Sequence, residues 1–253
     1  MYPEIFHISF LHTYGVLVAL GFLAAVWMAT RLARAAGIDA DAVANLGIYC
    51  ALAAMAGAKL MMFAVDPGAR RDIFSWASLQ AGGIFYGGLI AALAVSWWYV
   101  RKRGLPPLET ADVFAPAIAL GHAIGRLGCF SAGCCWGKEC HLPWAVTFRD
   151  PVANDITGVT LNVPLHPTQL YESFALFLIF GILYWRIGRP HGKGAIIGSY
   201  LMLYGAARFV VEFFRYHEQG NLWGGPLDTS QAISLALIAL GASRFLLLRR
   251  AAG

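Results

Sequence analysis

The segment Gly125–Gly137, with the sequence GRLGCFSAGCCWG, holds the residue types best suited to chemistry. Arg126 ends an apolar run, where a guanidinium group costs about 2.5–3.5 kcal/mol to place in hydrocarbon, so a charge kept there indicates a functional site. Its planar fork suits bidentate binding of a phosphate. The neighbouring glycines let the backbone approach a ligand closely. The segment therefore predicts a membrane enzyme that holds a phospholipid headgroup at this point.

Other polar residues interrupt the apolar runs in pairs. His122 and Arg126 lie four residues apart, as do Arg208 and Glu212, so each pair shares one face of a helix. Further polar groups within or beside apolar runs are Tyr14, Lys59, Tyr86, Gln169 and Glu172. Structural alternatives exist: Arg208 and Glu212 could form a purely structural ion pair, His122 could be a hydrogen-bonded core residue, and the lysine and Tyr14 could extend toward the interface. The convergence of the set favours an anion-binding cavity.

Four of the five cysteines lie within twelve residues, at positions 129, 134, 135 and 140, while Cys50 stands alone in an apolar run. Their spacing is not one of the usual zinc spacings, so we assign no metal ligand and expect no cofactor. Two other possibilities remain open. One is a disulfide that uses Cys129 or Cys140, and the other is a reactive thiolate near Arg126.

Composition and periodicity predict an all-α polytopic membrane protein. The chain of 253 residues is 58% hydrophobic and 13% charged, against about 25% charged in soluble domains. Apolar stretches of about 20 residues are long enough to cross a bilayer. We expect about seven spans in a single membrane domain (1–253), at roughly 14–31, 43–64, 82–100, 112–129, 167–185, 194–214 and 229–248. No cleavable signal peptide is expected, and the net charge of +5 does not indicate nucleic-acid binding, because the basic residues are scattered at helix ends.

The basic residues predict an orientation. Eleven of the 19 Lys and Arg residues fall on one side: Arg31, Arg34, Arg101, Lys102, Arg103, Arg186, Arg189, Lys193, Arg244, Arg249 and Arg250. The other side holds Arg70, Arg71, Lys138, Arg149 and Arg215. The positive-inside rule then places the N-terminus outside and the C-terminus inside. The longest loop, 130–166, becomes a small head on the outer face.

Local patterns refine this arrangement. The head reads as turns with one or two short strands, such as 144–148. Gly21 and the pairs Gly82-Gly83 and Gly87-Gly88 resemble small-residue contacts between membrane helices. No internal repeat is visible, which weighs against a transporter built of inverted halves.

Several motifs together resemble the bacterial prolipoprotein diacylglyceryl transferase family. Gly125–Gly137 looks like the family's glycine-arginine signature, and HPTQLYE at His166–Glu172 matches its box at the start of a late helix. YGAARFVVEFFR, from Tyr204 to Arg215, resembles its arginine-containing span. Tyr14-Gly15 and the Gly-Gly-Leu box at 87–89 complete the set in the expected order.

The resemblance implies a seven-span enzyme of the bacterial inner membrane with its active site toward the periplasm. Such an enzyme transfers diacylglyceryl from phosphatidylglycerol, a membrane lipid, to the lipobox cysteine of a prolipoprotein and releases glycerol phosphate. The family's two key arginines correspond to Arg126 and Arg208, and its paired glutamate to Glu212. Substrate-binding roles are implied for Tyr14, Gly87, Gly88, Cys129, Cys134, Gly137, His166, Glu172 and Glu212.

The chain departs from the family pattern at three of the candidate site residues. Well-known members carry a histidine where this chain has Tyr86, and Asn and Glu where it has Cys129 and Cys134. A cysteine-bearing branch with the pattern GCF-x-AGCC resembles this chain. His122 is our candidate base in place of the absent histidine, and Tyr86 is a weaker one because a phenol is a poor base at neutral pH. The alternatives are a lipid transferase or thiol-redox protein with another acceptor, and an inactive lipid-binding homologue.

Overall fold

The computed structural model describes residues 13–66, 83–216 and 227–252. The elements are α1 (Thr13–Ala35), α2 (Ala40–Val65), α5 (Phe85–Arg103), α6 (Pro107–Ala132), β1 (Val146–Thr147), α7 (Pro151–Thr157), β2 (Pro164–Leu165), α8 (Thr168–Ile187), α9 (Ala195–Glu212) and α10 (Thr229–Ala252). The expectations for the first twelve residues, Arg70, Arg71 and Gly82 fall outside the described residues.

The prediction of an all-helical polytopic membrane protein is confirmed. Six of the described helices, namely α1, α2, α6, α8, α9 and α10, are long and apolar enough to cross a bilayer. Helix α5 corresponds to the remaining expected span, at 82–100, but it is not among these six. Its last turn is Arg101-Lys102-Arg103, which lowers its mean hydropathy. Many large apolar side chains point outward, as a lipid environment requires; Leu23, for example, is 61% exposed.

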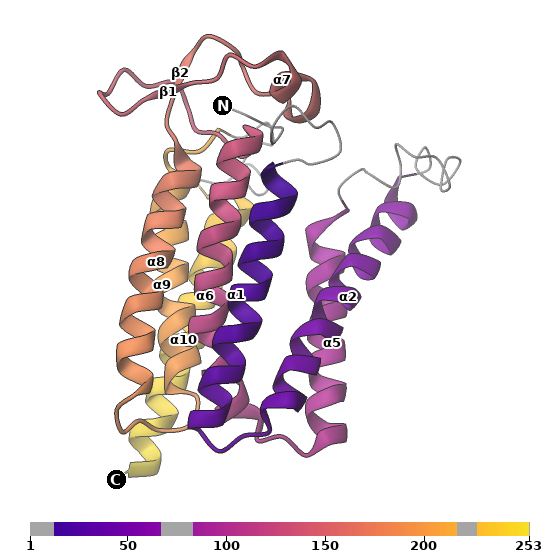
Figure 1. Cartoon of the computed structure of the whole chain (residues 1–253). Coiled ribbons are helices and arrows are strands. Elements are labelled where there is room, and N and C mark those ends of the chain that lie inside the picture. Colours follow the sequence, from indigo (N-terminus) through magenta and orange to yellow (C-terminus); the bar gives the residue numbers. More distant parts are fainter. Residues whose placement is uncertain (1–12, 67–82, 217–226, 253) are drawn as a thin grey trace. The chain divides into compact units, whose positions relative to one another are not determined.

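Contacts divide the chain into two compact units, Met1–Met28 with Ala111–Gly253, and Ala29–Thr110. In the first unit, α6, α8, α9 and α10 run side by side with the first part of α1, and the segment between α6 and α8 covers one end (Figure 1). Small alanines of α6 pack against larger residues of α8 and α9 in a core of Ala115, Ala119, Ile179, Leu183, Ile196 and Tyr200. At the end opposite that segment, the buried Asp112 of α6 accepts hydrogen bonds from the backbone N–H groups of Gly194 and Ile197 at 2.6 and 2.8 Å, which caps α9.

The head combines a short hairpin with one helix. Strands β1 and β2 pair antiparallel, with Val146 opposite Leu165, so the expectation of a short strand near 144–148 is confirmed. The expectation of turns for the rest of the head is wrong at Pro151–Thr157, because these residues form α7. Asp150 accepts a hydrogen bond from Val152 N, and Gly158 ends the helix in the left-handed conformation. An aspartate cap, a proline in the first turn and a terminal glycine are ordinary helix signals, which the turn interpretation overlooked.

Glycines bring helices into close contact in both units, as expected for small residues in membrane helices. A Cβ added at Gly21 of α1 would lie 2.7 Å from the carbonyl oxygen of Gly121 of α6. In the second unit, α2 and α5 pack through Gly57 and Gly87, where an added Cβ on either would lie 2.5 Å from the other's carbonyl oxygen. A Cβ added at Gly83 would lie 2.6 Å from Ala58 of α2, and one added at Gly88 would lie 2.8 Å from the Ala54 carbonyl oxygen.

We expect Gly57→Ala to destabilise the α2–α5 pair. The new methyl group would lie 2.4 Å from Ala91 Cβ, and overpacking of this kind costs about 1–3 kcal/mol. Thermal unfolding of the detergent-solubilised protein checks this. Gly181→Ala in α8 is the matched control, since nothing lies within 4 Å of a Cβ there. Equal unfolding temperatures for the two variants would contradict tight packing at Gly57.

Candidate functional site

A buried carboxylate, Glu172 of α8, lies at the centre of the candidate site. Its side chain is 3% exposed, and its Oε2 atom lies 2.7 Å from Arg126 Nη2 and 3.9 Å from Arg208 Nη1. Its Oε1 atom lies 3.6 Å from His122 Nε2 and accepts a hydrogen bond from the Tyr204 hydroxyl at 3.3 Å. One carboxylate of α8 therefore holds groups from two other helices, α6 and α9.

The two arginines that the sequence singles out come together at this carboxylate. Arg126 and Arg208 are on different helices, and their side chains are 13% and 12% exposed. Arg208 also forms the expected ion pair with Glu212, one turn along α9, and donates a hydrogen bond to Ser230 Oγ at 3.4 Å. Two guanidinium groups and two carboxylates balance in charge, as a buried ionic cluster requires.

Arg126 retains hydrogen-bonding capacity beyond its ion pair. Its Nε atom is buried and has no hydrogen-bond partner among the described residues. Its Nη1 atom donates a hydrogen bond to a weak acceptor, Cys129 Sγ, at 3.9 Å. A buried guanidinium with an unsatisfied donor is suited to bind an oxyanion.

His122 lies on the same face of α6 as Arg126, as the four-residue spacing predicts. Its side chain is 31% exposed, more than either arginine, and its ring lies 5.4 Å from the ring of Tyr204. This partly exposed imidazole beside a carboxylate can take up a proton from a group that enters the site.

Three thiols lie just beyond Arg126, where α6 ends. The Sγ atoms of Cys129, Cys134 and Cys135 all lie within 4.8 Å of one another, and all five cysteines are free thiols. Hydrogen bonds from the Cys129 and Cys134 thiols, aided by the positive charge of Arg215, lower the pKa of Cys135 although burial opposes them. Hydrogen bonds with the Cys129 and Cys135 thiols, together with burial, raise the pKa of Cys134. The sequence placed all three cysteines in one cluster, but only Cys129 and Cys134 were predicted as substrate-binding residues.

The start of α8 fixes the turn that carries the Cys134 and Cys135 thiols. Gln169 Nε2 donates a hydrogen bond to the Cys134 carbonyl at 2.6 Å, and Thr168 Oγ1 donates to the Cys135 carbonyl at 2.8 Å. Gly137, two residues further on, has no room for a side chain, because an added Cβ would lie 2.5 Å from the Phe214 carbonyl oxygen. The HPTQLYE box thus supplies both the central carboxylate and the support for the cysteine turn.

Two further candidates lie near this cluster. Tyr14 of α1 packs against Gly128 and is close enough to Arg126 and the three cysteines to interact with them electrostatically. His166 lies at the head, with its Nδ1 atom 3.1 Å from the Tyr171 hydroxyl. Burial, and secondarily the charge of Lys138, lower the pKa of His166, which favours its neutral form.

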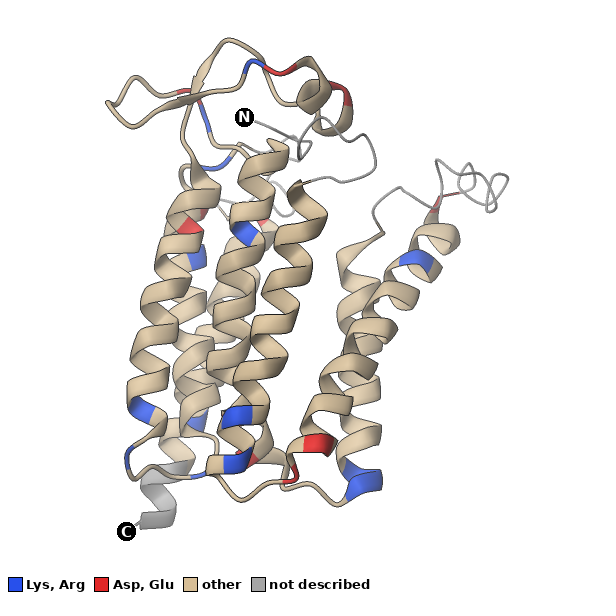
Figure 2. Ribbon diagram, viewed as in Figure 1, with Lys and Arg blue, Asp and Glu red and all other residues tan. Residues whose placement is uncertain are grey.

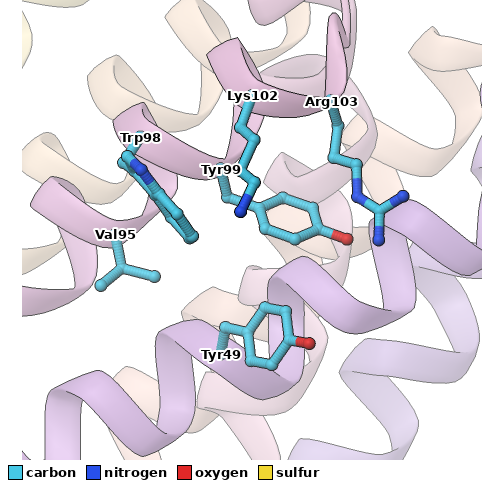
Figure 3. A pocket seen from close by; sticks show the side chains of 6 residues that line it. All are labelled: Tyr49, Val95, Trp98, Tyr99, Lys102 and Arg103. Atoms are coloured by element: carbon cyan, nitrogen blue, oxygen red, sulfur yellow. The ribbon is translucent and has the colours of Figure 1, made fainter.

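The remaining candidates, Tyr86, Gly87 and Gly88, are on α5 in the second unit. Tyr86 is 46% exposed, and the two glycines pack against α2. A hollow in this unit has a largely aromatic and basic lining and includes none of the candidate residues (Figure 3). It is lined by Tyr49, Val95, Trp98, Tyr99, Lys102 and Arg103.

Comparison with known proteins decides the family. The family model described as "Prolipoprotein diacylglyceryl transferase" matches residues 3–247. The chain belongs to this family. The phosphatidylglycerol–prolipoprotein diacylglyceryl transferase of Clostridium tetani is 34% identical over 95% of both chains. The enzymes of the same name from Finegoldia magna and Vibrio cholerae are 35% and 33% identical over 90% of this chain, covering 87% and 83% of their own lengths.

Membership in the prolipoprotein diacylglyceryl transferase family confirms the resemblance drawn from the motifs. Tyr204 and Ser230 were not predicted as site residues, and the central position of Glu172 was missed. A carboxylate within an apolar helix was the available signal, since such a group needs a cationic partner.

Proposed function

We propose that this protein transfers the diacylglyceryl group of phosphatidylglycerol to the lipobox cysteine of a prolipoprotein and releases glycerol phosphate. Family membership and the names of its relatives support the reaction class. The observation that carries the assignment in this chain is the convergence of Arg126 and Arg208 on one buried carboxylate. Two such cations suit a substrate whose reacting part is a phosphodiester.

Arg126 and Arg208 stabilise the phosphate as it leaves. The glyceryl carbon–oxygen bond breaks with its electron pair on the phosphate oxygen, so negative charge grows there. Glu172 and Glu212 hold the guanidinium groups in place beforehand, and fixed charges in a site of low dielectric act strongly. The buried Arg126 Nε supplies a donor for a phosphate oxygen.

The acceptor thiol must lose its proton as its sulfur bonds to the glyceryl carbon. His122 takes up this proton in our proposal, because its exposed edge is open to a substrate and Glu172 stabilises the imidazolium that forms. Tyr14, Gly137 and His166 surround the same end of the helices and are proposed to contact the substrates. Tyr86, Gly87 and Gly88 keep substrate-binding roles as predictions from the family pattern.

We expect His122→Gln to slow transfer by about 100-fold or more, the usual contribution of a general base. Initial rates with phosphatidylglycerol and a lipobox peptide measure this. His141→Gln is the control, since that head histidine is 81% exposed and lies 3.6 Å from Glu139 rather than at the arginine cluster. A wild-type rate for His122→Gln would assign the proton to Tyr86 or to water.

We also propose that the site faces the periplasm and that the protein is in the inner membrane. Figure 2 supports this orientation within the first unit, since blue residues gather at the ends of α8 and α9 opposite the head. The basic residues there are Arg186, Arg189 and Lys193, and Arg244 of α10 donates a hydrogen bond to the Lys193 carbonyl. By the positive-inside rule that end is cytoplasmic, and the arginine cluster is then in the outer half of the bilayer.

Incubation of the purified protein with phosphatidylglycerol and a lipobox peptide, followed by mass spectrometry, tests the reaction. The expected product is the peptide with a diacylglyceryl group on its cysteine, and a peptide with serine in that place should stay unmodified. Absence of product would favour the alternative that the cysteine cluster suggests, a thiol-redox protein or lipid transferase with another acceptor. Complementation of a strain depleted of its ordinary transferase separates these possibilities.

A further inference from the structure

The three clustered thiols have no role in the mechanism described so far. Cys129 lies in the last turn of α6, and Cys134 and Cys135 follow in the turn after the helix. Their Sγ atoms, all within 4.8 Å of one another, point to a common place although the chain reverses between them.

The backbone holds Cys135 in a conformation that does not favour a cysteine. Its φ angle is 61°, in the left-handed region, where a residue with a Cβ is strained by about 1–2 kcal/mol. Glycine would adopt this conformation without strain. The hydrogen bonds from Thr168 and Gln169 fix the turn from outside, so the thiol itself is not needed to form it. A cysteine at this position therefore indicates a use for its sulfur atom.

The spacing of the three sulfur atoms suits a metal ion better than a disulfide. Zinc–thiolate bonds are about 2.3 Å long, so three thiolates on a tetrahedral ion lie roughly 3.8 Å apart. The observed cluster needs only small side-chain movements to reach that geometry. A disulfide requires about 2.05 Å between two sulfur atoms and would leave the third thiol without a role.

The surroundings also suit an anionic three-thiolate site. Arg126 Nη1 lies 3.9 Å from Cys129 Sγ, and the charge of Arg215 acts on Cys135. Three thiolates around Zn²⁺ carry one net negative charge, which the positive charge of Arg215 offsets. The contact between Arg126 and Cys129 places the cluster directly beside the arginine that is proposed to hold the leaving phosphate.

We propose that Cys129, Cys134 and Cys135 bind Zn²⁺ and that the acceptor cysteine of the substrate occupies its fourth coordination position. This inference rests on the proposed function. Three protein ligands leave one position of a tetrahedral ion open, as in catalytic zinc sites. A thiol that coordinates such an ion is deprotonated. The ion thus supplies the activated thiolate directly beside Arg126.

The step balances in atoms and charge. The acceptor thiol binds the ion and loses its proton, which passes through water to His122, about two helical turns earlier on α6. A lone pair of the bound sulfur attacks the glyceryl carbon while the carbon–oxygen bond breaks toward the phosphate at Arg126. The thioether that forms is a weaker ligand than a thiolate and dissociates from the ion. No oxidant or reductant is required.

Metal binding is tested on the full-length, reduced protein in detergent. Elemental analysis should find one zinc per chain, and the metal-free protein should bind one Co²⁺ with the near-ultraviolet absorption of cobalt–thiolate bonds. Cys135→Gly is the decisive variant, because it removes a ligand while relieving the strained backbone. We expect it to weaken Co²⁺ binding by about 100-fold or more, since loss of an outer-shell partner alone costs 10–100-fold. Cys50→Ser and Cys140→Ser are matched controls that should bind like the wild type.

Addition of the acceptor separates this inference from the proposed function. A lipobox peptide should intensify the cobalt–thiolate absorption, and its serine counterpart should not. Failure of the reduced protein to bind Co²⁺, equal binding by Cys135→Gly, or full transfer activity of metal-free protein would overturn the zinc site while leaving the transferase assignment intact. Metal binding that needs Cys135, without any lipid product, would instead overturn the proposed function and leave the metal site.

Discussion

Replacing Arg126 by alanine is expected to lower the transfer rate by about 1,000-fold or more while the protein remains folded in the membrane. Loss of one uncharged donor to a developing oxyanion costs about 100–1,000-fold, and Arg126 contributes a full charge as well as its donors. The change leaves Glu172 with Arg208 at 3.9 Å and the Tyr204 hydroxyl at 3.3 Å as partners, so the unfolding temperature should fall but the protein should still fold. Initial rates of peptide lipidation measure the effect, with thermal unfolding as the check on folding.

Two further variants define what Arg126 supplies. Arg126→Lys keeps the charge but loses the planar fork, so its rate should fall between those of the wild type and the alanine variant. Arg189→Ala is the control, because that arginine is exposed and stacks on Trp185, with its Cζ atom 3.4 Å from the ring centroid. Near-normal transfer by Arg126→Ala would remove the phosphate-binding role from this residue.

The helices and the two arginines could be predicted because their signals are local. A span is recognised from about 20 consecutive apolar residues, and the four-residue spacing of His122–Arg126 and Arg208–Glu212 fixes which side chains share a face. The ion pair between Arg208 and Glu212 needs nothing beyond α9 itself. These features therefore agree with the structure.

The partners of Glu172 could not be predicted, because they depend on how three helices pack. The sequence places Glu172 at the start of α8 but does not say that it faces α6 and α9 rather than lipid. Likewise, Cys135 joins Cys129 and Cys134 only because the chain turns sharply after α6, with a left-handed backbone at a residue that rarely adopts one. Helix α7 is a different case, because its local signals, the Asp150 cap and the terminal Gly158, are present in the sequence and could have predicted it.

The neutral variant Glu172→Gln should lose both stability and activity. Glutamine keeps the shape but removes the charge that Arg126 and Arg208 share, which leaves two buried guanidinium groups with Glu212 as the remaining carboxylate of the cluster. Breaking a buried ion pair from one side costs about 3–5 kcal/mol, so the unfolding temperature should fall by on the order of 10 °C. Transfer should fall about 100-fold or more as the guanidinium groups move apart.

A compensating change tests whether charge, rather than shape, causes the instability. In the double variant Glu172→Gln/Arg126→Met the Arg208–Glu212 pair is again balanced, so the unfolding temperature should recover by more than half while the transfer rate stays low. Glu139→Gln is the control for the single change, because that head carboxylate is 62% exposed. If the double variant were less stable than Glu172→Gln alone, Glu172 would act through packing and not as the counter-ion of the two arginines.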